Sequence, residues 1–186
     1  MTNTSWGDVT DLEEQGKYEE AAAISASLGM ESIIEANFEV SPELFIGLGK
    51  LLRGMSCDAR AANTHRVERL QGIVEYVASG AIEATSKDVE RGSLHEWIGD
   101  SYLMAESAKA LEHYSLAGDH YQDLDDKTQH TTGLSVEFDY TYNAYLTFVR
   151  SRGEEPEYNK AVVDFLGRIE EKQATARRLL SDDPAE

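Results

Sequence analysis

The sequence predicts an all-α protein made of stacked antiparallel helical hairpins, with no substantial β-sheet. Apolar residues recur at helical spacing through most of the 186 residues, and helix start and stop signals divide them into segments of helical length. Hydrophobic residues make up 41% of the chain and charged residues 28%, so a packed core is feasible. We therefore expect one domain over 1–186, with a frayed tail at 181–186.

The N-terminal part predicts a helical hairpin over about 4–29. Its helical pattern is broken at Gly16 and stops at Gly29. The next helix begins at Ser41-Pro42-Glu43, which combines an N-cap residue, a first-turn proline and a first-turn acid. We expect that helix to end near Gly54.

The middle of the chain predicts a long amphipathic helix over 58–85, on a stripe of apolar residues. Gly92 then predicts the end of a helix. Ser93 and Glu96 follow with the spacing of a capping box, which predicts a new helix from that point.

Two of the remaining segments each fit two different structures. The apolar phase slips at Met104–Ser107, which favours a tight turn, although 94–118 also fits one continuous helix. Residues 123–133 are polar and end in glycine, so they predict a loop. Residues 134–142 fit either a strand or a helix, and the longer pattern favours the helix. A last helix is expected over 157–180.

Two segments resemble the helical hairpins of tetratricopeptide repeats. That family places a small residue and a tyrosine on its first helix, where Gly99 and Tyr102 match. Its second helix carries alanine, an aromatic residue and alanine, where Ala110, Tyr114 and Ala117 match. Partial echoes occur elsewhere, at irregular intervals: Gly16-Lys17-Tyr18-Glu19-Glu20-Ala21, and Tyr158, Ala161 and Phe165.

The resemblance implies a function in binding a peptide or protein partner in a concave groove. The matched positions are packing positions, so they identify no residue of that groove. They do imply that Ala110 and Ala117 are buried against a neighbouring helix.

The charge of the chain restricts its partners. The 35 acidic residues outnumber the 17 Lys and Arg and leave a formal net charge of -18. Nucleic acids and anionic membranes both require basic surfaces, so we expect neither as a partner. Ten Arg against seven Lys, with so many acids, is typical of proteins from a salt-loaded cytoplasm, where salt screens the repulsion between carboxylates. We therefore expect a halophilic protein.

The chain also predicts a cytoplasmic location. Its first residues contain neither the basic region nor the apolar core of a signal peptide, and no stretch approaches the ~18 uninterrupted apolar residues of a membrane helix. The single cysteine, Cys57, has no partner for a disulfide or a shared metal and precedes an acid, so we interpret it as a structural thiol.

Acidic residues and tyrosines are the candidates for contact with a partner. A cluster of aspartates favours a basic protein or peptide, and nearby tyrosines offer aromatic rings with polar tips. The candidate partner-binding residues are Asp119, Asp123, Asp125, Asp126, Tyr140 and Tyr142.

Two alternatives to a binding module remain. His113, His120 and Asp123 share one face of a helix, so a helical-bundle metal protein or metalloenzyme would use them as ligands. A self-associating structural protein would instead bury its tyrosine face in a homodimer. No phosphate loop, dinucleotide fingerprint or serine nucleophile motif is present. The leading hypothesis is therefore a non-enzymatic interaction module without a cofactor.

Overall fold

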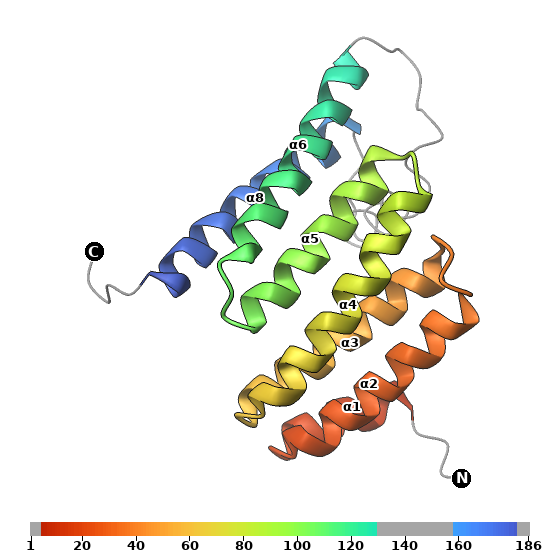
Figure 1. Ribbon diagram of the computed structural model, residues 1–186, viewed down its shortest axis with the longest axis vertical. Helices are drawn as coiled ribbons and strands as arrows, with labels where there is room; N and C mark the ends of the chain where they lie inside the picture. Colours follow the sequence, from red (N-terminus) through yellow and green to blue (C-terminus); the bar gives the residue numbers. More distant parts are fainter. Residues whose placement is uncertain (1–4, 130–157, 182–186) are drawn as a thin grey trace.

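The computed structural model describes residues 5–129 and 158–181, and every regular element in these ranges is an α-helix (Figure 1). The prediction of an all-α protein without a sheet is confirmed for this part of the chain. The described helices are α1 (Trp6–Glu14), α2 (Tyr18–Glu35), α3 (Pro42–Arg60), α4 (Thr64–Ala84), α5 (Asp88–Met104), α6 (Lys109–Gln129) and α8 (Tyr158–Leu180).

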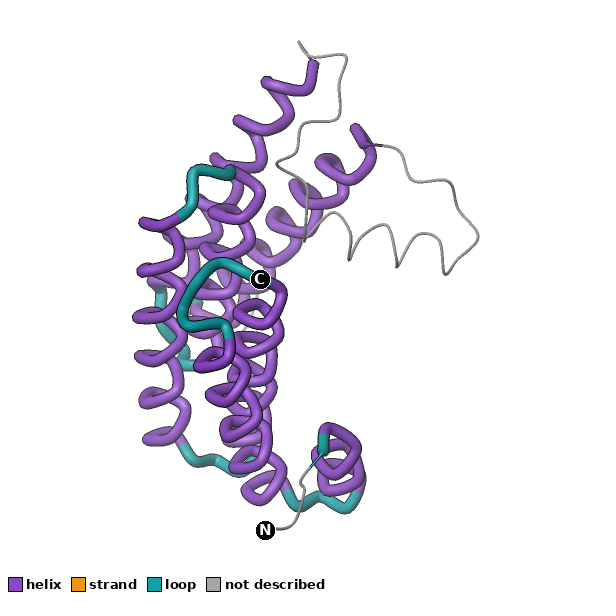
Figure 2. Tube along the Cα trace, turned by 90° about the vertical axis from the view of Figure 1, so that its right-hand side faces the viewer, coloured by secondary structure: helices purple, strands orange, loops and turns teal. Residues whose placement is uncertain are grey.

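Successive helices lie side by side, from α1 and α2 at one end of the array to α6 and α8 at the other (Figure 1). Each described helix packs against the next one in the sequence, which is the arrangement of stacked hairpins. Figure 2 shows the same array edge-on. In the described part of the chain, no helix has both the length and the apolar character needed to cross a bilayer.

Three of the expected helix boundaries are confirmed. Gly16 has a positive φ of 72° and separates α1 from α2, as glycine does most easily. The Ser41 hydroxyl accepts a hydrogen bond from the backbone of Leu44, at 3.3 Å, and so caps α3. The chain also turns between α5 and α6, where Glu106 has a φ of 54°, so the prediction of two helices over 94–118 is correct.

Two glycines predicted to end helices lie inside helices instead, because they permit a close approach between α2 and α3. A methyl group on Gly29 would lie 2.9 Å from the carbonyl oxygen of Gly47, and one on Gly54 would lie 3.3 Å from that of Ala22. A side chain at Gly29 would therefore force the two backbones apart. Helix α2 continues to Glu35 and α3 to Arg60.

Three further boundaries differ from the expectation. The helix predicted over 58–85 begins later, at Thr64, because α3 continues to Arg60 and residues 61–63 form a turn between α3 and α4. The predicted capping box at Ser93 is wrong, since α5 begins at Asp88 and the Ser93 hydroxyl contacts Tyr121 instead. The loop predicted over 123–133 is wrong in its first part, since α6 reaches Gln129. The segment 134–142 lies outside the described residues.

Buried apolar side chains form one large cluster that runs from α2 to α8. A smaller cluster of Val9, Ala21, Ala22 and Cys57 joins α1 to α2 and α3. Ala110 and Ala117 are both fully buried, so the packing expected of the α5–α6 hairpin is confirmed. Removing this apolar surface from water is the main stabilising contribution to such an array.

Candidate functional site

An open hollow of about 720 Å³ lies along α4 beside the turn that follows α2. We call it the α4 groove. It is lined by Phe38, Gly72, Glu75, Tyr76, Val77, Ser79, Gly80 and Glu83. Its volume is in the range of sites that accept a small molecule or a few side chains.

Phe38 forms one wall of the α4 groove, and the turn after α2 holds its ring away from the core. Asn37 and Phe38 both have positive φ, of 51° and 60°, a conformation that is costly for residues other than glycine. The Phe38 amide donates a hydrogen bond to the Ile33 carbonyl at 3.3 Å, which fixes the turn. Phe38 remains 49% exposed, so burial in the core does not explain its presence there.

Helix α4 supplies the other wall. Tyr76 is 78% exposed, and Gly72 and Gly80 lie one turn before and after it on the same face. A methyl group on either glycine would meet no atom within 4 Å among the described residues. The Tyr76 ring therefore stands between two stretches of bare backbone, where a ligand can reach the helix surface.

The charged residues that line the α4 groove are both acidic. Glu75 accepts hydrogen bonds from the Tyr102 hydroxyl at 2.6 Å and from Gln71 at 3.2 Å. The hydrogen bond from Tyr102 lowers the pKa of Glu75, so this carboxylate is ionised and held in a fixed position at neutral pH. Glu83 adds a second acid two turns further along the helix.

Three histidines form a row between α5 and α6, which we call the histidine row: His95, His113 and His120. The Nδ1 atoms of His95 and His113 lie 3.2 Å apart and share a hydrogen bond. The His95 ring stacks on His120, with ring centroids 5.6 Å apart, and the His113 ring stacks on Tyr102. Burial, together with the charges of His113, His120 and Arg91, lowers the pKa of His95 to about 4, so this ring is neutral at pH 7.

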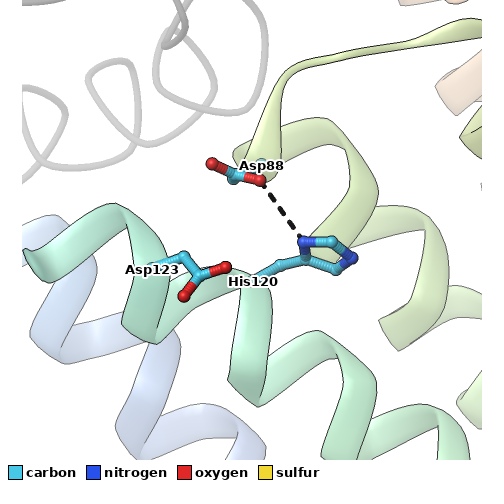
Figure 3. Close-up of side chains that lie close together, drawn as sticks. All are labelled: Asp88, His120 and Asp123. Carbon is cyan, nitrogen blue, oxygen red and sulfur yellow. Dashed lines mark ion pairs between the residues drawn. The ribbon is translucent and has the colours of Figure 1, made fainter. Parts of the chain in front are cut away.

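One end of the histidine row meets two carboxylates (Figure 3). His120 Nδ1 lies 3.4 Å from an oxygen of Asp88, and Asp123 follows His120 by one turn on α6. Potential ligand atoms of Asp88, His120 and Asp123 all lie within 4.8 Å of one another. The structure thus brings His120 and Asp123 together as the sequence predicted, but the third member of the group is Asp88. His113 is paired with His95 instead.

The structure describes the side chains of only two of the six predicted contact residues. Asp119 and Asp123 are exposed on α6. Asp125 and Asp126 lie in α6, where the structure describes only the backbone. Tyr140 and Tyr142 lie outside the described residues.

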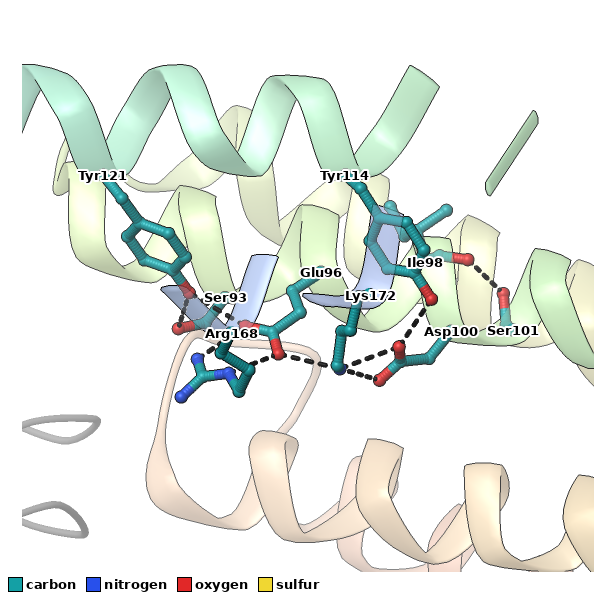
Figure 4. Close-up of polar contacts among 9 residues, drawn as sticks. All are labelled: Ser93, Glu96, Ile98, Asp100, Ser101, Tyr114, Tyr121, Arg168 and Lys172. Carbon is teal, nitrogen blue, oxygen red and sulfur yellow. Dashed lines mark hydrogen bonds and ion pairs between the residues drawn. The ribbon is translucent and has the colours of Figure 1, made fainter. Parts of the chain in front are cut away.

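A cluster of partly buried charges that the sequence did not reveal fastens α8 to α5 (Figure 4). We call it the α8 lock: Glu96, Asp100, Arg168 and Lys172. Arg168 donates to both oxygens of Glu96, at 2.7 and 2.6 Å. Lys172 bridges Glu96 and Asp100, at 2.8 and 2.7 Å. These bidentate and bridging contacts are the strongest class of hydrogen bond in proteins.

The pKa values of the two carboxylates of the α8 lock are shifted in opposite directions. Burial raises the pKa of Glu96, but hydrogen bonds from Arg168 and the charge of Lys172 outweigh that effect and leave the pKa below its usual value. Burial of Asp100 is only partly offset by Lys172 and by the Tyr114 hydroxyl, so the pKa of Asp100 is raised. Folding therefore favours the ionised form of Glu96 and disfavours the ionised form of Asp100.

Cys57 is fully buried, and its sulfur lies 2.8 Å from a Glu13 oxygen. Burial, together with Glu13, raises the pKa of the thiol to about 12. The thiol is therefore protonated at neutral pH and is a weak nucleophile, as its acidic sequence context predicted.

No family model, curated protein or solved structure matches this chain. The resemblance to tetratricopeptide repeats therefore stays a prediction that rests on the residues quoted for it.

Proposed function

We propose that this protein is a non-enzymatic interaction module whose α4 groove binds a basic, partly apolar segment of a partner protein. The observation that carries the proposal is the exposed Tyr76 between two glycines, in a hollow that the exposed Phe38 also lines. Exposed aromatic residues around a hollow are typical of surfaces that bind another molecule.

Charge complementarity selects the partner. The acids Glu75 and Glu83 line the groove, and the whole chain carries a formal net charge of -18. A Lys or Arg of the partner would pair with these carboxylates and lie over the faces of Phe38 and Tyr76, where cation–π attraction adds to the ion pair. An apolar side chain beside that basic residue would cover the rings. The bare backbone at Gly72 and Gly80 gives such a segment room on both sides of Tyr76.

A peptide-display selection tests this proposal. Random 12-residue peptides are selected against the wild-type protein, and the enriched sequences are then tested against the double variant Phe38→Ser, Tyr76→Ser. We expect enriched peptides in which Lys or Arg lies next to an aromatic or aliphatic residue, and we expect the double variant to retain few of them. Trp6→Ser is the matched control, because Trp6 is an exposed aromatic residue, 45% accessible, outside the groove. Enrichment of acidic peptides, or equal retention by the double variant, would contradict the proposal.

A further inference from the structure

We propose that Asp88, His120 and Asp123 form a binding site for a divalent transition-metal ion. The three residues come from the first turn of α5 and from two successive turns of α6 (Figure 3). In the described part of the chain, this is the one group of three or more His, Cys, Asp or Glu residues whose potential ligand atoms lie within 4.8 Å of one another.

The position of His120 Nδ1 points to a ligand. This nitrogen is buried, yet it makes no hydrogen bond to any described residue, and the nearby Asp88 oxygen at 3.4 Å does not satisfy it. A buried polar atom without a hydrogen bond is costly and calls for a physical explanation. Two ligand atoms on one tetrahedral ion with bonds of about 2.1 Å are about 3.4 Å apart. The separation between His120 and Asp88 therefore suits a shared ion.

The ligand set selects the class of metal. One imidazole nitrogen and two carboxylates suit zinc, manganese or iron, whereas magnesium and calcium prefer oxygen ligands alone. Asp88 is 6% exposed and Asp123 is exposed, so the site is covered on one side and open to water on the other. Water molecules would complete the coordination, as in metal sites with three protein ligands.

The surroundings support the same assignment. The His95 ring stacks on His120 with an interplanar angle of 12°, so the imidazole of His120 is packed against a neighbouring ring on one face. The net negative charge of the protein raises the local concentration of cations. An ion at this position would also join the start of α5 to α6 and so strengthen the hairpin on which α8 packs.

Equilibrium zinc binding to the untagged protein, in buffer without chelator, tests this site. We expect one zinc ion per chain, at least ~10-fold weaker binding in His120→Gln and in Asp123→Asn, and a higher thermal unfolding temperature on adding zinc to the wild type. Asp123→Asn is the more secure variant, because Asp123 is exposed and its replacement should leave folding intact. Substitution with cobalt gives an independent readout, since its visible absorption reports the coordination geometry.

Two control variants decide the ligand set. His65→Ala removes an exposed histidine on α4, and His113→Ala removes the histidine paired with His95. Both should bind zinc as the wild type does. Zinc binding that is weak, involves many sites and is unaffected by His120→Gln would overturn the proposal. Loss of binding in His113→Ala with full binding in Asp123→Asn would also overturn it, because it would move the site to the other end of the histidine row.

Discussion

Tyr114 and Tyr121 lie against the backbone of α5 because glycine occupies the facing positions. A methyl group on Gly99 would lie 2.5 Å from the Tyr114 ring, and one on Gly92 would lie 2.6 Å from the Tyr121 ring. The two glycines are seven residues apart, as are the two tyrosines, so the same contact repeats two helical turns further along the hairpin. Both rings are fully buried. Their hydroxyls reach Asp100 and Glu96, so each tyrosine also connects the core to the α8 lock.

We expect Gly99→Ala to destabilise the protein by about 1–3 kcal/mol, because the added methyl group overpacks the interface. The overlap outweighs the gain of ~0.5–1 kcal/mol that alanine brings to a helix interior. Urea unfolding measures the change. Gly167→Ala on α8 is the matched control, since a methyl group there would meet no described atom within 4 Å, and it should stabilise slightly. Equal effects of the two substitutions would show that the Gly99–Tyr114 contact is not tight.

His95 predicts a specific dependence of stability on pH. Its pKa is lowered from 6.5 to about 4 in the folded protein, chiefly by burial. The contribution of the neutral His95 ring to the free energy of unfolding is therefore fully present above pH ~6.5 and is lost as the pH falls toward 4. We expect NMR titration in buffer with chelator to give a midpoint near 4, and His95→Gln to reduce the decline in unfolding free energy between pH 6.5 and 4. A His95 midpoint near 6.5 would contradict this interpretation of the histidine row.

The candidate metal site was only partly predictable from the sequence. The spacing of His120 and Asp123 places them on one helix face, which periodicity alone can show. The contribution of Asp88 depends on how α5 is positioned along α6, which is a matter of packing contacts such as Gly99–Tyr114 that a single sequence does not show. In the α4 groove, the exposure of Tyr76 was predictable, because Tyr76 lies off the apolar stripe of its helix.

At the scale of elements, α8 is fastened to the α5–α6 hairpin by apolar packing and by ion pairs. Phe165 packs against Tyr121, with ring centroids 5.1 Å apart, and Ile169 and Ala176 are buried. The α8 lock lies beside this apolar contact and connects residues 72 positions apart in the sequence. Because the desolvation cost of partly buried ion pairs offsets much of their attraction, we interpret the lock as fixing the position of α8 rather than as a large source of stability.

Glu96→Gln should destabilise the protein by about 2–3 kcal/mol, because it leaves the charge of Arg168 facing a neutral amide and removes one of the two carboxylates that hold Lys172. Glu170→Gln changes the charge by the same amount at an exposed position of α8 and should have little effect. Urea unfolding compares the two variants. Limited proteolysis adds a second readout, and cleavage should begin within α8 in Glu96→Gln. Equal stability of the two variants would show that the lock does not hold α8 in place.

Helix positions were easier to predict from the sequence than helix ends. Gly16 and Ser41 marked true boundaries because one needs a positive φ and the other caps a helix through its side chain. Gly29, Gly54 and Gly92 looked like the same signal, but each provides room for a neighbouring helix. A single sequence does not separate these two uses of glycine, because both depend on the absence of a side chain.

At the scale of the whole molecule, the acidic charge predicts a response to salt. At a net charge of -18, repulsion between carboxylates opposes the compact state. Raising the salt concentration from 0.1 M to 1 M shortens the screening length from ~10 Å to ~3 Å and removes most of that repulsion. We expect the thermal unfolding temperature to rise over this range. An unfolding temperature that falls would contradict the expectation of a halophilic protein.

The same charge should govern recognition of a partner. Binding in the α4 groove depends on Glu75 and Glu83, which are screened as salt rises. We therefore expect the affinity for a basic peptide to fall between 0.1 M and 1 M salt, in the same range where the folded protein becomes more stable. A salt-independent affinity would show that the aromatic residues alone carry the interaction.

The most direct test of the proposed function is the dissociation constant of a fluorescent basic–aromatic peptide from the display selection, measured by anisotropy. Tyr76 is 78% exposed, so its replacement removes a contact surface with little effect on folding. We expect Tyr76→Ser to weaken binding at least ~10-fold, the scale of a central interface residue, and Trp6→Ser to bind as the wild type does. Equal affinities for wild type and Tyr76→Ser would contradict the assignment of the α4 groove as the partner-binding site.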